Sequence, residues 1–244
     1  MGKQLIAQGA EAKIFLVDST TIDKESINIL RTDFQSNEQI NPEKKTATKK
    51  ESPLILNQTP YKKFILKSRI SKSYRHPIID KQIRIRRTRS EAKILNKALS
   101  LGINVPSVIK TEKFNLEIEY IKGDKLSEKL NYFSKQKQST AMKMLGEQTA
   151  KLHDAEIIHG DLTTSNTIFK KNKLFIIDFG LGFFSPKIED KAVDLHLIKQ
   201  ALEAKHYKNY KELFEQFLSG YAPKDKEKII KKLETVEKRG RYKH

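Results

Sequence analysis

Two short polar motifs in the second half of the chain carry the residues best suited to chemistry. The first, His159–Asn166, places Asp161 and Asn166 five positions apart, and the second places Asp178 after an apolar run and before Gly180. Phosphoryl transfer from ATP needs a carboxylate that orients the accepting hydroxyl, and oxygen ligands that hold Mg²⁺. We therefore interpret Asp161 as the base or orienting group and Asn166 and Asp178 as metal ligands. Either motif alone fits an ordinary turn, since Asp and Asn favour turns; both in this order favour the catalytic interpretation.

An upstream lysine and glutamate complete this set. Lys67 ends a short β-prone stretch, and Glu91 is the only acidic residue among seven basic ones between Lys81 and Lys97. Phosphate oxygens need a positioned cation, and a carboxylate on a neighbouring helix can fix that cation. Taken alone, Lys67 fits a solvated surface lysine equally well. Together with the two motifs, it indicates a catalytic Lys67–Glu91 pair.

Strands are expected in the first half of the chain and helices in the second. Leu5–Val17 has the pattern of strand, turn and strand around Gly9, whose backbone can take a positive φ. Short apolar runs predict further strands at Lys62–Lys67, Phe114–Ile121, Thr167–Phe169 and Leu174–Ile177. Helical spacing predicts helices at Ile79–Leu101 (ended by Gly102), Thr140–Ile158, Val193–Ala204, Tyr210–Leu218 and Lys224–Lys238. The pattern indicates an α+β protein with a small sheet lobe and a helical lobe.

Composition sets wider limits. The chain has 244 residues with 48 Lys+Arg and 30 Asp+Glu, a formal charge of +18, and its hydrophobic fraction is 37%. It has no cysteine, which excludes disulfides, thiolate metal sites and a cysteine nucleophile. No apolar run approaches the roughly 20 residues that a membrane span needs, so we expect a soluble intracellular protein. Asp18–Pro60 is polar and is interpreted as a flexible insertion, with one strand near Ile27–Leu30.

The motif order resembles a known family. Lys67, Glu91, His159–Asn166 and Asp178–Gly180 follow one another as in the protein-kinase fold. More closely, the chain resembles the small atypical kinase/ATPase subunits of the KEOPS complex, which forms threonylcarbamoyladenosine on tRNA. The matching stretches also include Gln8–Ala12, Tyr74–Asp80, Arg86–Ala92, Glu189–Leu195 and Arg239–Arg241.

The resemblance implies a bilobal, minimal protein-kinase-like fold. Residues 1–118 would form the N-terminal lobe, with an antiparallel sheet, one main helix and the insertion at 18–60. Residues 119–236 would form a reduced helical lobe, and residues 237–244 a basic tail. ATP and Mg²⁺ are the implied cofactors. The implied partners are the threonylcarbamoyl transferase subunit, other KEOPS subunits and tRNA, with no membrane, and the implied location is the cytoplasm, with the nucleus as a further one.

The resemblance also implies where the nucleotide binds. Backbone groups of Glu119 and Ile121 would bond adenine, with Ile118 behind the ring and Ile168 beneath it. Asp194 would bond the backbone of the catalytic loop. The loop over the phosphates would consist of Gly9, Ala10, Glu11 and Ala12.

Three departures from ordinary kinases stand out. The phosphate loop has one glycine instead of three, and Gly160 replaces the arginine that usually precedes the catalytic aspartate and reads an activation-loop phosphate. Gly180 and the helix expected at Val193 are 13 positions apart, which leaves little room for an activation segment. We therefore expect weak activity towards free proteins and dependence on a partner. The resemblance implies the same: ATP hydrolysis coupled to a bound partner, with autophosphorylation.

The positive charge gathers in one region. Residues 60–97 contain 13 Lys/Arg and 2 Asp/Glu, which favours nucleic-acid binding over a solvated basic face. Aromatic residues are sparse there, so stacking on unpaired bases is not indicated. Three alternative functions stay open: a ribosome-assembly-type atypical kinase, a small-molecule phosphotransferase of the aminoglycoside or choline kind, and a catalysis-independent scaffold that binds tRNA or nucleotide.

Overall fold

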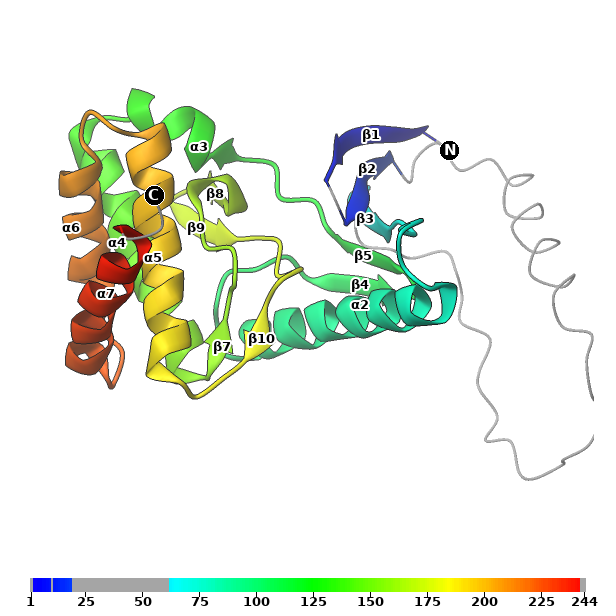
Figure 1. Ribbon diagram of the computed structural model, residues 1–244. Helices are drawn as coiled ribbons and strands as arrows, with labels where there is room; N and C mark the ends of the chain where they lie inside the picture. Colours follow the sequence, from blue (N-terminus) through cyan, green and yellow to red (C-terminus); the bar gives the residue numbers. More distant parts are fainter. Residues whose placement is uncertain (1, 10, 19–61, 242–244) are drawn as a thin grey trace, which may run out of the picture.

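The chain folds into a sheet-rich N-terminal lobe and a helical C-terminal lobe (Figure 1). A computed structural model of the chain describes residues 2–9, 11–18 and 62–241. The predicted α+β, bilobal architecture is confirmed. Apart from Asp18, the predicted insertion Asp18–Pro60 lies outside the described residues, as does the strand predicted near Ile27–Leu30.

A five-stranded antiparallel sheet forms the N-terminal lobe. Its order is β1-β2-β3-β5-β4, so β3 is the central strand. Lys67 of β3 pairs in register with Ile14 on one side and with Leu116 on the other. Because side chains alternate along a strand, Lys67 and Arg69 share one face of the sheet. The strands span Gly2–Gln8 (β1), Ala12–Asp18 (β2), Lys63–Arg69 (β3), Val108–Thr111 (β4) and Asn115–Glu119 (β5).

One long helix, α2 (Pro77–Ser100), runs along the sheet (Figure 1). Pro77 stands at its start, where a missing amide hydrogen costs nothing. The helix ends at Ser100, and Gly102, the predicted terminating glycine, follows it with a φ of 70°. The Gly102 amide donates to the Leu99 carbonyl at 3.0 Å, and the Ile103 amide donates to the Ala98 carbonyl at 3.1 Å. This is the hydrogen-bond pattern of a helix that is terminated by a glycine. Glu91 lies on the buried face of α2.

The C-terminal lobe is built mainly from helices. A small sheet of order β6-β8-β9 and a pair formed by β7 and β10 lie at its junction with the N-terminal lobe (Figure 1). The strands are β6 (Asp124–Lys125), β7 (Ile157–Ile158), β8 (Thr167–Lys170), β9 (Lys173–Ile176) and β10 (Phe183–Phe184). The helices are α3 (Leu126–Lys129), η2 (Leu130–Tyr132), α4 (Lys135–Asp154), η3 (Thr164–Asn166), α5 (Ile188–Lys205), α6 (Tyr210–Gly220) and α7 (Lys226–Arg241).

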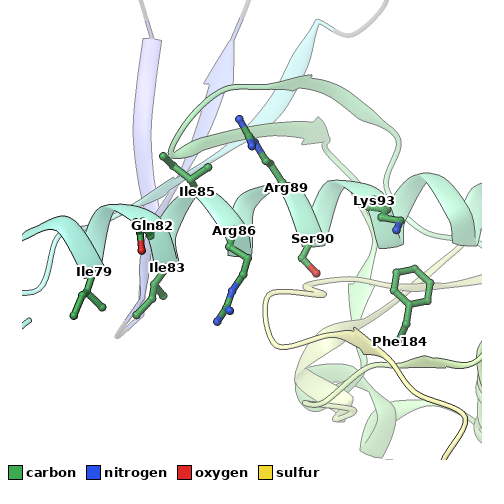
Figure 2. A pocket seen from close by; sticks show the side chains of 9 residues that line it. All are labelled: Ile79, Gln82, Ile83, Ile85, Arg86, Arg89, Ser90, Lys93 and Phe184. Atoms are coloured by element: carbon green, nitrogen blue, oxygen red, sulfur yellow. The ribbon is translucent and has the colours of Figure 1, made fainter.

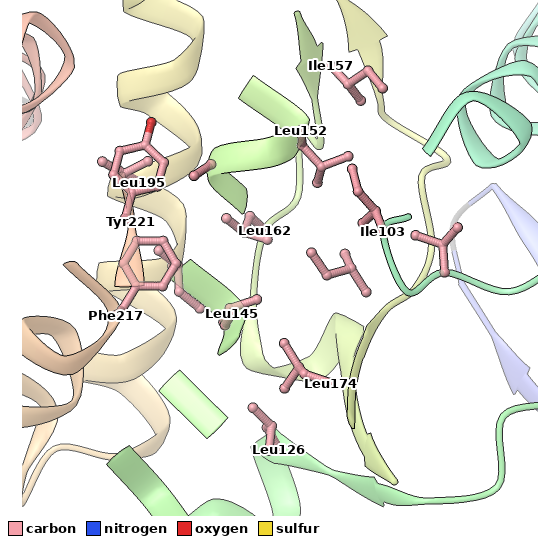
Figure 3. Close-up of a cluster of buried hydrophobic side chains, with 14 of the residues drawn as sticks. Ile103, Leu126, Leu145, Leu152, Ile157, Leu162, Leu174, Leu195, Phe217 and Tyr221 are labelled. Carbon is pink, nitrogen blue, oxygen red and sulfur yellow. The ribbon is translucent and has the colours of Figure 1, made fainter. Parts of the chain in front are cut away.

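The main core lies where α4, α5 and α6 meet the β8–β9 hairpin (Figure 3). Leu145, Leu195 and Phe217 are fully buried there. Helices α4 and α6 cross at a pair of glycines: a Cβ at Gly146 would clash with the Phe217 carbonyl, and a Cβ at Gly220 with that of Lys143. This close crossing holds α4 rigidly behind the loop that follows it.

Several element boundaries differ from those expected. Helix α4 begins at Lys135 because Ser134 caps it by accepting a hydrogen bond from the Lys137 amide. Helix α5 begins at Ile188 instead of Val193, which shortens the segment after Gly180 further. Strand β4 was not expected from the sequence, and α7 continues to Arg241.

The turn between β1 and β2 also differs in detail from its prediction. The Gly9 amide donates to the Ala12 carbonyl at 3.0 Å, as a tight turn requires. Gly9 itself does not adopt a positive φ, so the predicted use of its backbone freedom is wrong. Within the described residues, no helix combines the length and apolar character needed to cross a bilayer.

Candidate active site

Lys67, Glu91 and Asp178 meet between the two lobes. The Lys67 Nζ donates to the Glu91 Oε1 at 2.8 Å and to the Asp178 Oδ1 at 2.6 Å. These side chains come from β3, from α2 and from the loop after β9, so the cluster forms only when the lobes are packed together. Lys67 and Glu91 are buried, whereas the Asp178 side chain is 38% exposed. The structure thus brings together the lysine, the glutamate and one aspartate that the sequence singled out.

A second cation, Arg69, joins this cluster and was missed from the sequence. Its Nη2 donates to the Glu91 Oε2 at 2.7 Å, and both side chains are almost fully buried. Each oxygen of Glu91 therefore receives its own cationic donor. The sequence did contain the information needed to identify Arg69. It stands two residues after Lys67 in the same strand, and side chains two residues apart lie on the same face of a strand.

The charges of this cluster stabilise one another. Burial alone raises the pKa of Asp178, but Lys67 and the hydrogen bond from the Gly180 amide outweigh it, so this pKa lies below its usual range. Burial alone lowers the pKa of Lys67, but Glu91 and Asp178 outweigh it, and this pKa lies above its usual range. Both groups are therefore ionised at neutral pH.

Asp161 and Asn166 form a second cluster in residues 159–166, between β7 and β8, the segment expected to be the catalytic loop. The Asn166 Nδ2 donates to the main-chain oxygen and to the Oδ2 of Asp161, both at 2.9 Å. The Asn166 carbonyl accepts from the Ile177 amide at 2.9 Å, which ties this loop to the residue before Asp178. The two motifs recognised in the sequence are thus neighbours in space.

Gly160 is required by the shape of this loop. Its φ is 76°, and a Cβ at this position would lie 2.5 Å from the Leu181 carbonyl oxygen. An arginine here would need both an unfavourable backbone conformation and a shift of the Leu181 segment. The glycine in place of the usual arginine therefore belongs to a different packing of the loop against the segment after Gly180.

Asp194 anchors the same loop from α5, as expected. Its Oδ2 accepts from the His159 amide at 2.7 Å and its Oδ1 from the Gly160 amide at 2.8 Å. The Nε2 of His153 also contacts this carboxylate at 3.3 Å, and the hydroxyl of Tyr221 lies 2.7 Å from the other ring nitrogen. This buried chain links the catalytic loop to α4 and to the end of α6; the role of Tyr221 had no signal in the sequence.

His159 supports the loop through its ring. Its Nδ1 accepts from the Asp161 amide at 3.2 Å, so the hydrogen is on Nε2, which donates to the Ile177 carbonyl at 3.1 Å. The ring also packs on Phe179, with 4.6 Å between the ring centroids. His159 therefore holds both motifs together and has no nitrogen left for proton transfer.

The oxygen donors at the site fit Mg²⁺. Asn166 uses its amide nitrogen on Asp161, so its side-chain oxygen is the atom left to meet a cation. Asp178 adds an ionised carboxylate. Among the described residues, no group of three or more His, Cys, Asp or Glu side chains could hold a metal by itself. Two protein oxygens completed by phosphate and water are typical of Mg²⁺ in nucleotide sites.

The expected phosphate loop is only partly described, since Ala10 lies outside the described residues. The Glu11 carboxylate is paired with two arginines: Arg75 Nη2 contacts its Oε1 at 3.3 Å and Arg87 Nη1 contacts its Oε2 at 2.8 Å. Burial raises the pKa of Glu11, but the two arginines outweigh it and hold that pKa below its usual range. Only the backbone of this turn is therefore suited to meet a phosphate.

The expected hinge has one backbone donor already in use. The Glu119 amide donates to the Ser107 carbonyl at 2.9 Å, so adenine could use only the carbonyl of Glu119. Ile121 lies two residues after Glu119 and is buried. Ile118 is buried in the sheet, and Ile168 is half-buried on β8. These positions are compatible with the expected adenine pocket.

The Tyr74–Asp80 stretch has a structural role. Asp80 is buried at the start of α2, where its carboxylate accepts from the Ser71 hydroxyl at 3.0 Å and from the Arg84 Nε at 2.7 Å. The Arg84 guanidinium also lies 3.9 Å from the Phe114 ring centroid. This motif therefore fixes α2, and with it Glu91, against the sheet.

The basic cluster on α2 is divided between two faces. Arg84 and Arg87 are used within the lobe, by Asp80 and by Glu11. Arg86 and Arg89 are exposed and line a groove of about 790 Å³ that Phe184 of β10 closes from the other lobe. Figure 2 shows Ile79, Ile83 and Arg86 on the side of α2 that faces Phe184.

The comparisons with known proteins agree with this geometry. Residues 43–181 match the family model described as the RIO domain. A Pyrococcus abyssi protein named KEOPS complex subunit Bud32 is 45% identical over 186 residues, covering 74% of this chain and 84% of that protein. An Archaeoglobus fulgidus protein named probable serine/threonine-protein kinase BUD32 homolog is 35% identical over 179 residues, covering 73% of this chain and 88% of that one.

Other relatives are much longer than this chain. A Methanosarcina mazei protein named probable bifunctional tRNA threonylcarbamoyladenosine biosynthesis protein is 35% identical over 195 residues, covering 79% of this chain but only 34% of that protein. Among solved structures, the streptomycin–ATP–APH(2″)-IIa ternary complex matches with a TM-score of 0.53 and 15% identity, covering 97% of this chain and 82% of that one. The latter likeness supports the kinase-like fold alone.

Proposed function

This chain belongs to the RIO-domain family and, within it, to the Bud32 proteins, and from that premise we propose that it is an atypical serine/threonine protein kinase and ATPase. In this proposal it uses ATP and Mg²⁺ and acts as the kinase-like subunit of a KEOPS complex, in the threonylcarbamoyladenosine modification of tRNA. Its partners would be the threonylcarbamoyl transferase subunit and the other subunits of that complex. The contact of Lys67 with both Glu91 and Asp178 is the observation that carries the enzymatic part.

Each residue of the site has a role in this proposal. Lys67 would meet the phosphates, with Glu91 fixing its position. Asp178 and Asn166 would hold Mg²⁺, which supplies positive charge to the transferring phosphoryl group when it is bound. Asp161 would orient the accepting hydroxyl or water, and its hydrogen bond from Asn166 holds its carboxylate in place for that task.

The nucleotide would lie between the lobes. The backbone of Gly9, Ala10, Glu11 and Ala12 would face the phosphates, the Glu119 carbonyl and the Ile121 amide would bond adenine, and Ile168 would pack beneath the ring. We place the lobe boundary between residues 118 and 119, and treat residues 237–244 as a basic C-terminal segment. Arg239 contacts Glu189 of α5 at 2.6 Å, which keeps the start of this segment beside the site's lobe.

The short segment after Gly180 supports dependence on a partner. Only residues 181–187 separate Gly180 from α5, and two of them, Phe183 and Phe184, pair with β7. Such a segment leaves little backbone to align a peptide substrate. We therefore propose that the main activity is ATP hydrolysis coupled to the complex, with autophosphorylation as a secondary reaction, in the cytoplasm or the nucleus.

Purification of the chain from native cells tests the assignment. The expected result is that a threonylcarbamoyl transferase and tRNA-modifying activity copurify with it. An Asp161→Asn variant should still recover the same partners but should fail to support the modification. Recovery without any tRNA-modifying protein would contradict the assignment to this complex, and full modification by the variant would contradict a catalytic role.

A further inference from the structure

A hollow lined by aromatic, amide and lysine side chains on the C-terminal lobe shares no residue with the candidate active site. Its volume is about 620 Å³, within the range of roughly 300–1,000 Å³ typical of ligand sites. One wall comes from η2 and the start of α4, and the other from the connection between α5 and α6. We propose that this hollow binds an unpaired nucleotide of RNA, with the base stacked on Tyr132 or Tyr207 and the phosphate on Lys208 and Lys135.

The two tyrosines carry the first part of this proposal. Tyr132 is 84% exposed and Tyr207 is 68% exposed, and both line the hollow. Large rings exposed on the same hollow leave their faces available for stacking, and aromatic side chains stack on bases of any sequence. The sequence indicated no stacking surface because the aromatic residues near the basic stretch are few; the fold creates one elsewhere.

The charge of the lining fits a phosphate. Two lysines and no carboxylate are among the lining residues. Within the part of the chain that the structure describes, no ion pair joins Lys208 to an acid. Lys135 contacts Glu212 at 2.5 Å, but both side chains are more than half exposed, and such surface pairs are weak enough to exchange for a phosphate.

The residues at the floor of the hollow are held by a network of hydrogen bonds. The ring of His206 is buried and contacts the Asn131 Oδ1 at 2.7 Å and the Thr164 hydroxyl at 3.3 Å. The Asn209 Nδ2 donates to the Gln138 Oε1 at 3.0 Å, while the Gln138 Nε2 donates to the backbone carbonyls of Leu130 and Phe133, both at 3.1 Å. Because most of the side-chain amide atoms of Asn131, Gln138 and Asn209 already have hydrogen-bond partners within the protein, we expect stacking and charge to dominate recognition, with little preference for base identity.

The same lining argues against a protein partner at this place. Lysine is depleted at protein interfaces, and two lysines, Lys135 and Lys208, are among the lining residues. This inference deepens the proposed function, on which the choice of RNA as the ligand rests, by naming a lobe surface outside the catalytic cluster that contacts the RNA. It stands or falls independently of ATP turnover.

Fluorescence anisotropy with a labelled, unstructured RNA decamer tests the proposal. The full chain is used with saturating ADP and Mg²⁺, so that nucleotide binding between the lobes does not contribute. We expect Tyr132→Ala with Tyr207→Ala to weaken binding about five-fold or more, the lower end of what a base–aromatic stack contributes. The matched Tyr→Phe double variant should retain affinity, because it keeps both rings.

Two further variants separate stacking from general charge. Lys173→Ala removes an exposed lysine that does not line the hollow and should leave the affinity unchanged, whereas Lys208→Ala should weaken it. A matched RNA duplex should bind more weakly than the single strand, and free cytidine monophosphate should compete only at high concentration. Unchanged affinity in the double tyrosine variant, equal binding of the duplex, or no binding of RNA by the wild type would each overturn the proposal.

Discussion

Arg69 donates to the Glu91 carboxylate at 2.7 Å, on the oxygen that Lys67 does not use. This ion pair is almost completely buried, so neither partner can turn to water for a substitute. Glu91 is thereby held from two directions, by cations that lie two residues apart on the same strand. The geometry of the expected catalytic lysine depends on this shared carboxylate.

Arg69→Met should therefore weaken both the fold and the reaction. Removing one partner of a buried ion pair costs about 3–5 kcal/mol, so thermal unfolding should occur at a markedly lower temperature. Because Glu91 would then shift towards Lys67, we expect ATP turnover to fall about ten-fold, or about 1.4 kcal/mol in barrier. Steady-state kinetics and urea unfolding measure the two effects.

Two comparisons make this prediction specific. Arg69→Lys keeps a cation and should restore part of the turnover. The double variant Arg69→Met with Glu91→Gln should lose less than the sum of the single losses, because the two residues act through one contact. Full additivity would show that Arg69 does not act through Glu91.

Gly160→Ala should impair the catalytic loop, and Gly102→Ala is its natural control. Both glycines have a positive φ, of 76° and 70°, and alanine in that conformation costs about 1–2 kcal/mol. A Cβ at Gly102 meets nothing within 4 Å, whereas one at Gly160 lies 2.5 Å from the Leu181 carbonyl. We expect Gly102→Ala to lose stability only, and Gly160→Ala to lose more stability and most ATP turnover. Equal losses in both would contradict the packing described for the loop.

His206 should make the fold sensitive to mild acid. Burial of the ring, with a smaller effect of Lys205, holds the pKa of His206 below its usual range. In the unfolded chain the pKa of histidine is about 6.5, so below that pH the unfolded state binds a proton that the folded state excludes. The free energy of unfolding should therefore fall as the pH decreases from about 6.5.

Urea unfolding between pH 7.5 and 5.5 measures this dependence. His206→Gln should be less stable at pH 7.5, because it loses the contacts to Asn131 and Thr164, but its stability should change less with pH. The exposed His76 provides a control, and His76→Gln should keep the slope of the wild type. If the free energy of unfolding of His206→Gln changed with pH as steeply as that of the wild type, groups other than His206 would cause the acid sensitivity.

Much of the fold followed from local pattern. Strand alternation, the helical spacing along α2 and the glycine at its end were readable in the chain because each depends on neighbouring residues. The predicted helix boundaries were wrong where a side-chain cap sets the start of the helix, as Ser134 does for α4. The short strand β4 was missed because only its first two residues, Val108 and Ile109, are apolar, so it shows no strand pattern of its own.

The candidate site, too, could be predicted from the sequence only in part. Lys67, Glu91, Asp161 and Asn166 stood out because phosphoryl transfer restricts which residue types can serve and in what order. The supporting contacts could not be read from sequence, since they join distant elements: His153 on α4 contacts Tyr221 beyond α6, and His206 contacts Thr164 in the catalytic loop. Whether a buried histidine faces a carboxylate, a hydroxyl or an apolar side chain is decided only by tertiary packing.

ATP turnover by two aspartate variants tests the central claim most directly. Asp161→Asn and Asp178→Asn remove the expected orienting group and the expected metal ligand, and Asp225→Asn changes a half-buried aspartate outside the site, paired with Lys228 at 2.8 Å. With Mg²⁺ and the copurified partners present, we predict that turnover is lost in the first two variants and unchanged in the third, while circular dichroism shows all three folded. Turnover at the wild-type level in both Asp161→Asn and Asp178→Asn would contradict the account.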